Sequence, residues 1–457
     1  MTQTKQHEQD VDVWVGKRFP LTIRRLGVNG HGIGYYKHKV CFVPGALPNE
    51  VVVAEVTRVL PRYLEAKIHR IRKKSRDRVT PRDEYADIAG GFELESLAYQ
   101  QQLKFKRQVI IDSLEKFQPY GYRNYDVRPT IAAPEEYGYR NKAQFQIRMV
   151  NGKVAAGLYQ PNSHTLVDME TCAVQMPRTM ETVRAVTKMI EDLQIPVYDE
   201  KHNSGIIKTL AVRESWSTGE VQLTFITNSA KLPHKRELLE RIEKELPAVV
   251  SVMQNVNPGD TPLVWGKKMI HLAGKDSILE SLMGLDFKLS ARSFLQLNPE
   301  QTEVLYEEAS KALELDKDDT LIDAYAGIGT IGLSLASRVK AVRGMEIIPE
   351  AVADANENAK LNNIANAKYE VGKAEEVLPR WQKEGLNFDA LVVDPPRTGL
   401  DDQLIKQILK VKPRKFAYVS CGMASLARNL RRLTSDMMPQ TARCEAVVKL
   451  SLRNGNK

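Results

Sequence analysis

The start of the chain carries short stretches in which apolar and polar positions alternate, separated by segments rich in glycine and proline. Residues 14–25 and 51–59 alternate in this way, and residues 40–43 form a shorter apolar stretch between them. A period of two is typical of strands with one buried face. Short strands with turn residues at this spacing favour a small closed barrel. The pattern therefore predicts an OB-like β-barrel over residues 10–72.

The middle of the chain mixes helical and strand-like patterns. After an irregular basic segment, apolar residues recur at helical spacing over about 97–118, a helix that could pack against the C-terminal domain. Strand-like and helical stretches then follow one another over residues 143–150, 176–193, 210–214, 221–227 and 231–246. The mixture predicts a central α+β domain over residues 73–275.

From residue 276 onward, helical stretches alternate with short, almost wholly apolar ones. The apolar stretches cover residues 320–324, 341–346, 390–394 and 416–420. One helix is expected to begin at Asn298-Pro299-Glu300, because asparagine caps helices and proline and an acid suit the first turn. Alternation of this kind is typical of an open, largely parallel sheet. It predicts a Rossmann-like α/β domain over residues 276–457.

Several acidic or nucleophilic residues fall at the carboxyl ends of these expected strands. Open α/β sheets bind their ligands at that edge. We therefore take the following residues as candidates for a functional site: Asp323, Glu346, Asp394 and Cys421.

The distribution of charge suggests a polyanionic partner. The chain has a formal charge of +9, and residues 67–78 contain seven lysines or arginines against one aspartate. Alone, such a segment is a solvated strand end, but beside a nucleic-acid-binding module it becomes a phosphate-contacting strip that includes Lys73 and Lys74. Arg140 and Lys142, in a basic and aromatic segment farther along, could likewise reach an RNA backbone.

The cysteines and the apolar content exclude several classes of protein. Cys41, Cys172, Cys421 and Cys444 are widely spaced and form no C-x-x-C pair, so no metal site and no disulfide framework is expected. No apolar stretch is long enough to cross a membrane, and the polar N-terminus lacks the core of a signal peptide. We therefore expect a cytoplasmic protein without membrane contact.

A glycine-rich motif points to a nucleotide-type cofactor. Residues 327–332 match G-x-G-x-x-G, and Glu346 follows Gly327 by 19 residues, a pattern also found in dinucleotide-binding proteins. Asp323 stands four residues before Gly327, where its carboxylate would repel a pyrophosphate. S-adenosylmethionine (SAM) has no phosphate and carries cationic groups, so the motif favours SAM. Gly327 and Gly329 would then let the backbone approach the cofactor, and Glu346 would bind the ribose hydroxyls.

Asp394-Pro395-Pro396-Arg397 follows an expected strand and forms a rigid loop suited to holding a planar base. In amino-directed DNA methyltransferases a related loop ends in an aromatic residue that stacks on the target base. Arg397 takes that place here. Methylation of an exocyclic amine is therefore the weaker interpretation, and Arg397 is a candidate substrate contact.

Cys421 and Glu445 together suggest covalent chemistry on an electron-poor ring. A ring carbon such as C5 of uracil attacks a methyl donor poorly, but thiolate addition at C6 makes C5 reactive. A base must then remove the C5 proton so that the thiol can leave. Cys421 can serve as the nucleophile and Glu445, 24 residues later, as the general base. Taken singly, they would be a core thiol and an exposed acid.

These motifs resemble, in the same order, those of the RNA uracil-C5 methyltransferase family, and the resemblance covers nearly the whole chain. Arg24–Ala66 is similar to the family's TRAM domain, an OB-like RNA-binding barrel. Ser293–Asn298 resembles its S-F-x-Q-x-N motif, and Asp323–Thr330 resembles its D-L-Y-C-G-x-G-T loop. The resemblance implies cofactor contacts for Gln296 and Tyr325.

The remaining motifs of the family have counterparts farther along the chain. Glu346 and Asp394 fall at its further cofactor and site positions. Residues 420–422 are similar to its nucleophile motif, and residues 441–445 are similar to its base motif. The resemblance thus assigns SAM as the cofactor and supports the roles of nucleophile and base given above.

The chain departs from the family's pattern at three places. Gly422 replaces the asparagine that usually follows the nucleophile, and Arg443 replaces the histidine before the base. Relatives that hold an iron–sulfur cluster bind it through four cysteines, and this chain keeps a cysteine at one of these positions, Cys172. The other three positions are occupied by Asp83, Ala89 and Phe92. One thiolate cannot hold the cluster, so we expect none.

The resemblance also bears on the substrate. A TRAM domain favours large-subunit 23S ribosomal RNA over the transfer-RNA branch, whose bacterial members usually lack it. Cluster-free relatives include enzymes that act on two ribosomal uridines. We therefore expect a monomeric enzyme that forms 5-methyluridine in 23S ribosomal RNA, at one or two sites. The alternatives are a tRNA uracil-C5 methyltransferase, an RNA-binding assembly factor without activity, and a dinucleotide-dependent oxidoreductase.

Overall fold

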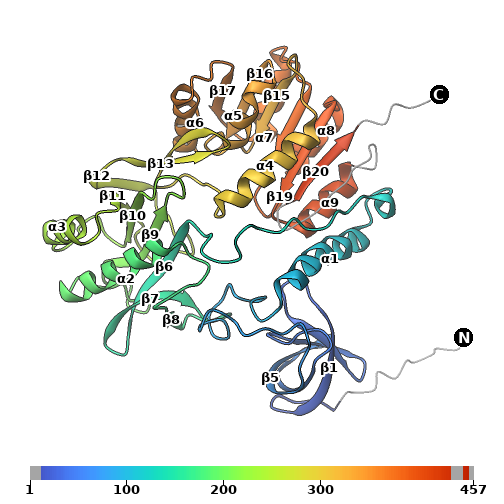
Figure 1. Ribbon diagram of the computed structural model, residues 1–457, viewed down its shortest axis with the longest axis vertical. Coiled ribbons are helices and arrows are strands. Elements are labelled where there is room, and N and C mark those ends of the chain that lie inside the picture. The colour runs from blue at the N-terminus through green and yellow to red at the C-terminus, as the bar shows by residue number, and fades with distance from the viewer. Residues whose placement is uncertain (1–11, 434–445, 452–457) are drawn as a thin grey trace, which may run out of the picture. The chain divides into compact units, whose positions relative to one another are not determined.

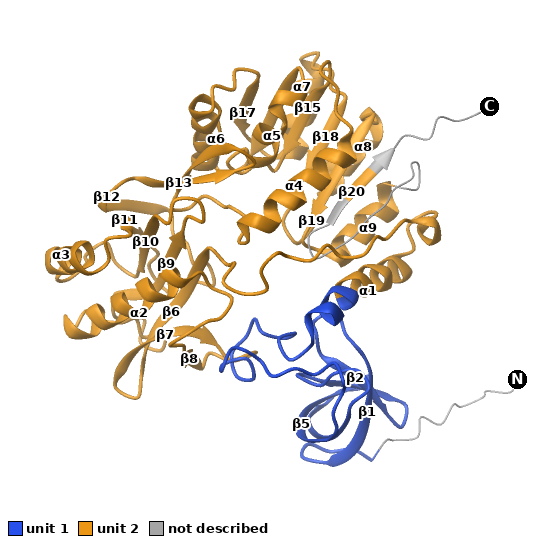
Figure 2. Ribbon diagram, in the orientation of Figure 1, with its two compact units in different colours: residues 1–105 blue, residues 106–457 orange. Residues whose placement is uncertain are grey.

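The computed structural model describes residues 12–433 and 446–451. The chain forms two compact units, residues 1–105 and residues 106–457 (Figure 2). The domain limits at residues 72 and 275 that the sequence suggests stay predictions. Among the helices that the structure describes, none combines the length and apolar character that a membrane span requires.

The first unit begins with a barrel, as predicted. Its strands are β1 (Arg18–Leu26), β2 (Gly32–Tyr36), β3 (Lys39–Val43), β4 (Val51–Val59) and β5 (Tyr63–Lys73) (Figure 1). They close in the order β1-β2-β3-β5-β4, with β3 and β5 parallel. Alternate side chains of β1, including Phe19, Leu21 and Ile23, are buried inside. β1 begins at Arg18 rather than at residue 14 because residues 15–16 form a turn.

The glycine-rich segment forms a turn at residues 28–30, as predicted, and then continues into strand β2. A Cβ atom on Gly34 would lie 2.7 Å from Leu21 Cγ and 2.7 Å from Thr22 O, closer than any side chain can come. Glycine is therefore required where β2 crosses β1, and it lets this small barrel close.

The segment after the barrel packs against it through a buried ion pair and a cluster of Leu26, Leu47 and Leu97. The Glu50 carboxylate accepts hydrogen bonds from Arg78 Nε at 2.6 Å and Leu47 N at 2.9 Å. Asp83, Ala89 and Phe92 are also buried in this segment. Helix α1 (Tyr99–Phe117) follows, close to the predicted range, and crosses into the second unit.

The second unit contains a seven-stranded mixed sheet in the order β12-β11-β10-β9-β6-β7-β8. Its strands are β6 (Lys142–Val150), β7 (Lys153–Tyr159), β8 (Leu166–Asp168), β9 (Ile207–Glu214), β10 (Val221–Thr227), β11 (Val249–Val256) and β12 (Lys268–Gly274). Its helices are η1 (Tyr122–Asn124), α2 (Pro177–Asp192) and α3 (Lys235–Glu245). β9 and β10 are buried along their whole length. This arrangement confirms the predicted mixed α+β region.

A hairpin and a second sheet complete the unit. The hairpin pairs β13 (Ser277–Leu282) with β14 (Leu285–Ser290). The sheet contains β15 (Thr320–Ala324), β16 (Ala341–Glu346), β17 (Ala367–Val371), β18 (Ala390–Val393), β19 (Lys415–Ser420) and β20 (Ala446–Ser451). The helices are α4 (Pro299–Leu313), α5 (Thr330–Leu335), η2 (Ala336–Arg338), α6 (Pro349–Leu361), α7 (Ala374–Lys383), α8 (Asp402–Val411) and α9 (Met423–Leu433).

The order of this sheet, β17-β16-β15-β18-β19-β20, is that of an open α/β fold. Neighbouring strands are parallel except β20, which runs antiparallel to β19. From β15 the chain builds outward to β16 and β17, and then returns to the other side at β18. Open α/β sheets bind ligands at such a reversal point. The predicted Rossmann-like domain is confirmed.

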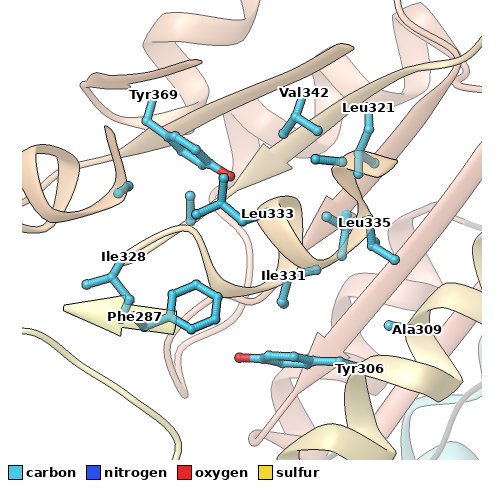
Figure 3. Packing of buried hydrophobic residues seen from close by; sticks show 14 of the residues in the cluster. Phe287, Tyr306, Ala309, Leu321, Ile328, Ile331, Leu333, Leu335, Val342 and Tyr369 are labelled. Atoms are coloured by element: carbon cyan, nitrogen blue, oxygen red, sulfur yellow. The ribbon is translucent and has the colours of Figure 1, made fainter. Parts of the chain in front are cut away.

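Buried side chains from the sheet and from its covering helices form one apolar cluster (Figure 3). Leu321 and Val342 project from β15 and β16 toward Leu333 and Leu335, which lie in and at the end of α5. From α4, the Tyr306 hydroxyl lies 2.7 Å from Thr330 Oγ1 at the start of α5. This packing fixes the loop between β15 and α5, which opens onto the carboxyl edge of the sheet.

Candidate active site

The sequence-predicted carboxylates and the cysteine lie at the carboxyl edge of the second sheet. Glu346 ends β16, Asp394 directly follows β18, and Cys421 directly follows β19. Asp323 is the penultimate residue of β15, which pairs with both β16 and β18. The fold thus gathers four predicted residues at the reversal point of the sheet.

The loop after β15 has an unusual backbone that keeps it open. Tyr325 has φ +65°, and Gly327 and Gly329 have φ +55° and +84°. A positive φ at tyrosine is a strained conformation of the kind that persists at functional sites. A Cβ atom on Gly327 would meet no atom within 4 Å. The space over Gly327 therefore leaves backbone atoms accessible to a ligand.

Two carboxylates line this loop. Glu346 accepts hydrogen bonds from Gly327 N at 3.1 Å and Ile348 N at 3.0 Å. Asp323 is buried and accepts one from Gly332 N at 2.9 Å. Burial, helped by the charge of Glu346, raises the pKa of Asp323 to about 7. Within the described part of the chain neither carboxylate forms an ion pair, so the loop disfavours a pyrophosphate and fits a phosphate-free cationic cofactor such as SAM.

Gln296 reaches this edge from the segment before α4. Its Nε2 atom lies 3.4 Å from Asp394 Oδ2, and its backbone oxygen accepts a hydrogen bond from Asn141 Nδ2 at 3.2 Å. Asn141 N also donates to Leu297 O at 2.9 Å. The start of β6, in the central sheet, therefore holds the segment that carries Gln296.

The turn before Gln296 is held by residues that sequence reasoning missed. Ser293 Oγ donates to Asp354 Oδ2 in α6 at 2.9 Å. The buried Arg213 in β9 donates to Ser290 O at 3.4 Å and to Ser293 O. Burial lowers the pKa of Arg213 to about 10. The neighbouring Phe294 is 62% exposed, whereas Arg292 in the same turn pairs with Glu350 of α6 at 3.1 Å.

The turn that carries Cys421 packs directly against the Asp394–Arg397 loop. Cys421 is partly buried, and Ser420 Oγ accepts a hydrogen bond from Gly422 N at 3.1 Å. Ser425 Oγ in α9 lies 2.6 Å from Gly422 O and 2.8 Å from Arg397 O. A hydroxyl on the first turn of α9 thus joins the cysteine turn to the second loop.

A second α9 side chain holds the same loop farther along. Asn429 is buried, and its Oδ1 atom accepts hydrogen bonds from Leu400 N and Tyr418 Oη, both at 3.0 Å. Asn429 falls among Leu426, Leu430 and other buried residues of the helix. A polar residue on an apolar helix face was the signal that could have revealed it.

The predicted RNA contacts belong to both units. Lys73 and Lys74, at the end of β5, are exposed in the first unit, and Arg397 is exposed in the second. Arg140 Nε donates to Lys142 O at 3.3 Å. Lys142 is partly buried, and burial together with Arg213 lowers its pKa.

Two further expectations concern the general base and metal binding. The predicted base Glu445, together with Arg443, lies outside the described residues. Among the residues that are described, no group of three or more His, Cys, Asp or Glu side chains could hold a metal ion.

Comparisons with known proteins identify the family. A family model described as tRNA (Uracil-5-)-methyltransferase matches residues 267–444, and a TRAM-domain model matches residues 12–69. An "Uncharacterized RNA methyltransferase" of Lactiplantibacillus plantarum is 59% identical over 99% of this chain and 96% of its own. One of Enterococcus faecalis is 50% identical over 95% of this chain and 98% of its own.

A solved structure is similar over almost the full length. It is that of the Pyrococcus abyssi tRNA (uracil-54, C5)-methyltransferase in complex with S-adenosyl-L-homocysteine. It is 26% identical, covers 94% of this chain and 99% of its own, and has a TM-score of 0.74. Together with the carboxylate-lined loop, these matches show that the chain belongs to the family of SAM-dependent RNA uracil-C5 methyltransferases that carry a TRAM domain.

Proposed function

We propose that the protein methylates C5 of one or more uridines in 23S ribosomal RNA through a covalent bond between Cys421 and C6 of the target base. The observation that carries the covalent step is the position of Cys421. It is partly buried and directly follows β19, which pairs with β18, the strand that Asp394 directly follows. The ribosomal substrate is supported by the TRAM barrel and its basic strip at residues 67–78.

In this proposal the chain's own residues prepare the uracil ring. The Cys421 sulfur adds to C6, so that the electron pair of the C5–C6 bond moves toward C5 and O4. Bound SAM would supply the electrophilic methyl group that C5 then takes. Glu445 removes the C5 proton, and the electron pair left behind expels the thiolate and restores the double bond. The target nucleotide must be unstacked for Cys421 to reach C6.

The test is a substrate RNA that contains 5-fluorouridine. Fluorine at C5 cannot leave as a proton, so the enzyme and the RNA should remain joined and migrate together on a denaturing gel. Intact 23S ribosomal RNA transcripts and tRNA transcripts are compared in the same assay with added SAM. Absence of a covalent product with either RNA would contradict the proposed mechanism and would favour a non-catalytic assembly factor.

A tRNA substrate is the second candidate, because the similar Pyrococcus abyssi enzyme is described as a tRNA (uracil-54, C5)-methyltransferase. Mass mapping of ribosomal RNA and tRNA from a strain that lacks the gene decides between the two. We expect 5-methyluridine to disappear from one or two 23S positions. Its loss from tRNA instead would replace the ribosomal proposal and leave the chemistry unchanged.

SAM is expected to bind more tightly as the pH rises from about 6 to about 8. Because the pKa of Asp323 is raised to about 7, much of the carboxylate is protonated at pH 6 in the cofactor-free protein. A cation beside it favours the ionised form, so binding should release a proton. Below pH 7 the affinity should fall by up to about tenfold per pH unit. Calorimetry in buffers of different ionisation enthalpy measures the released proton.

The same group makes the cofactor-free protein less stable at higher pH. The folded-state pKa of Asp323 lies above its usual value of 3.8. Its contribution to the free energy of unfolding is therefore complete below pH 3.8 and is lost as the pH rises through about 7. Asp323→Asn should remove both pH dependences. Proton release that persists in this variant would assign the effect to another group.

Lys73 and Lys74 are expected to contribute to the salt dependence of RNA binding. In Lys73→Ala/Lys74→Ala, the slope of log affinity against log salt should fall by about 0.7 to 0.9 for each lost phosphate contact. Lys67→Ala is the control on the same strand, because Lys67 Nζ already pairs with Glu55 Oε1 at 3.0 Å. Equal slopes in the double variant and the wild type would remove both lysines from the interface.

A further inference from the structure

The loop that joins β11 to β12, residues 257–267, is held in one conformation by buried asparagines. Asn255 Oδ1 accepts a hydrogen bond from Gly266 N at 2.7 Å, and its Nδ2 donates to Gly266 O at 3.0 Å. Asn257 Nδ2 donates to Leu263 O at 2.6 Å and to Val264 O at 2.9 Å. Both asparagines are buried, so these bonds are shielded from water.

Neighbouring strands brace the first part of the same loop. Lys208 Nζ in β9 donates to Gly259 O at 2.7 Å and to Asn257 O at 3.2 Å. Asn228, which follows β10, accepts a hydrogen bond from Gly259 N at 2.8 Å through its Oδ1 atom. A backbone fixed by this many side chains loses little freedom on binding, which is the property of a preorganised recognition loop.

This loop presents apolar side chains, Lys267 and the exposed carboxylate of Asp260, and Lys268 follows as the first residue of β12. Leu263 is 69% exposed, Trp265 is partly exposed, and Lys267 and Lys268 are exposed. Lys142 Nζ lies 5.0 Å from the centre of the Trp265 ring. Within the described part of the chain, none of these three lysines forms an ion pair. The surface therefore places an aromatic ring next to the amino group of Lys142, with two further lysines close in sequence.

This surface adjoins the segment that carries Gln296. Lys142 is the first residue of β6, and the preceding Asn141 donates to Gln296 O at 3.2 Å. Lys142 is also the register partner of Arg213, which holds Ser293 O. Asn141 therefore links Lys142 to the segment that carries Gln296.

We propose that Trp265 and Lys142, with Lys267 and Lys268, bind a single-stranded nucleotide next to the target uridine. The indole ring stacks on its base, and the lysines contact neighbouring phosphates. Aromatic rings flanked by cations are the general means of holding single-stranded RNA without a duplex. The low pKa that burial and Arg213 impose on Lys142 would rise when a phosphate approaches. The inference rests on the proposed function, since it requires an RNA substrate.

The test measures binding of a single-stranded 12-nucleotide oligouridylate to the full-length protein. Stacking should quench tryptophan fluorescence in the wild type, and Trp265→Phe should lose most of the quenching. Trp265→Ala should raise the dissociation constant for the oligonucleotide about tenfold. Trp216→Phe is the control, because Trp216 is also exposed, at 44%, but lies in the turn between β9 and β10.

Two further measurements distinguish loss of the proposed nucleotide contact from misfolding and from failure of the proposed methylation chemistry. The dissociation constant for SAM should be the same in Trp265→Ala as in the wild type, which shows that the variant is folded. Should Trp265→Ala fail this check, Lys142→Gln serves instead, with a weaker salt dependence as the expected result. Unchanged oligonucleotide affinity in a folded Trp265→Ala overturns this inference. The 5-fluorouridine adduct of the wild type tests the methylation chemistry independently, so the two proposals can fail separately.

Discussion

Cys421→Ala is expected to lose both methylation and the covalent adduct while it still binds SAM. Without the sulfur, C6 of the target uracil has no nucleophile, and C5 stays too electron-poor to take a methyl group. Loss of a covalent nucleophile typically costs about 10⁴-fold or more in rate. Glu346, which lines the cofactor loop, is held by the backbone amides of Gly327 and Ile348. Single-turnover methylation with saturating SAM measures the loss.

Cys41→Ala is the matched control. Cys41 is fully buried in the barrel, and burial raises the pKa of its thiol to about 12, so it cannot serve as a thiolate at neutral pH. Its replacement should cost only about 1 kcal/mol of stability through a small cavity and should leave the adduct intact. Methylation that survives in Cys421→Ala would exclude the covalent mechanism.

Gly422→Asn is expected to reduce methylation strongly, although it installs the residue that resembling enzymes usually have. A Cβ atom at this position would lie 2.3 Å from Ser425 Oγ and 2.6 Å from Arg397 O. Glycine therefore lets the cysteine turn and the Asp394–Arg397 loop approach each other. Pushing them apart by about 1 Å should cost on the order of 100-fold in rate. The measurement is the rate of adduct formation with saturating 5-fluorouridine RNA.

A second variant separates this clash from a general loss of stability. Gly422→Ala/Ser425→Ala removes one of the two close atoms, so it should recover part of the activity lost in Gly422→Ala. Ser425→Thr keeps the hydroxyl and should remain close to the wild type. The interpretation fails if Gly422→Asn forms the adduct at the wild-type rate.

The elements that the sequence predicts well are those whose signals are local. Helix α4 begins where expected because its cap is contained in neighbouring residues, with Asn298 Oδ1 accepting a hydrogen bond from Gln301 N at 3.1 Å. The buried strands β15, β16, β18 and β19 stand out because helices cover both of their faces. The edge strand β17 escaped prediction, because it is short and carries Lys368 and Glu370 among its few apolar positions.

The same distinction between local and long-range signals applies to the residues of the candidate site. Each candidate carboxylate lies at or next to the carboxyl end of a strand, so the fold class alone was enough to bring these residues together. The residues that hold the surrounding loops give no such signal. Arg213 acts on Ser293 from 80 positions away, and Ser425 acts on Arg397 from 28. Contacts of this kind depend on how the sheets meet, which a single sequence does not specify.

The hydrogen bonds between the central sheet and the segment that carries Gln296 determine how the second unit should unfold. Asn141 and Arg213 donate hydrogen bonds to the backbone around Gln296 and Ser293. Unfolding of either sheet would therefore leave polar groups of the other without their hydrogen-bond partners. The two sheets should then unfold together, in one cooperative step. Amide hydrogens in β9, remote from the glycine loop, should then exchange more slowly with deuterium once SAM is added.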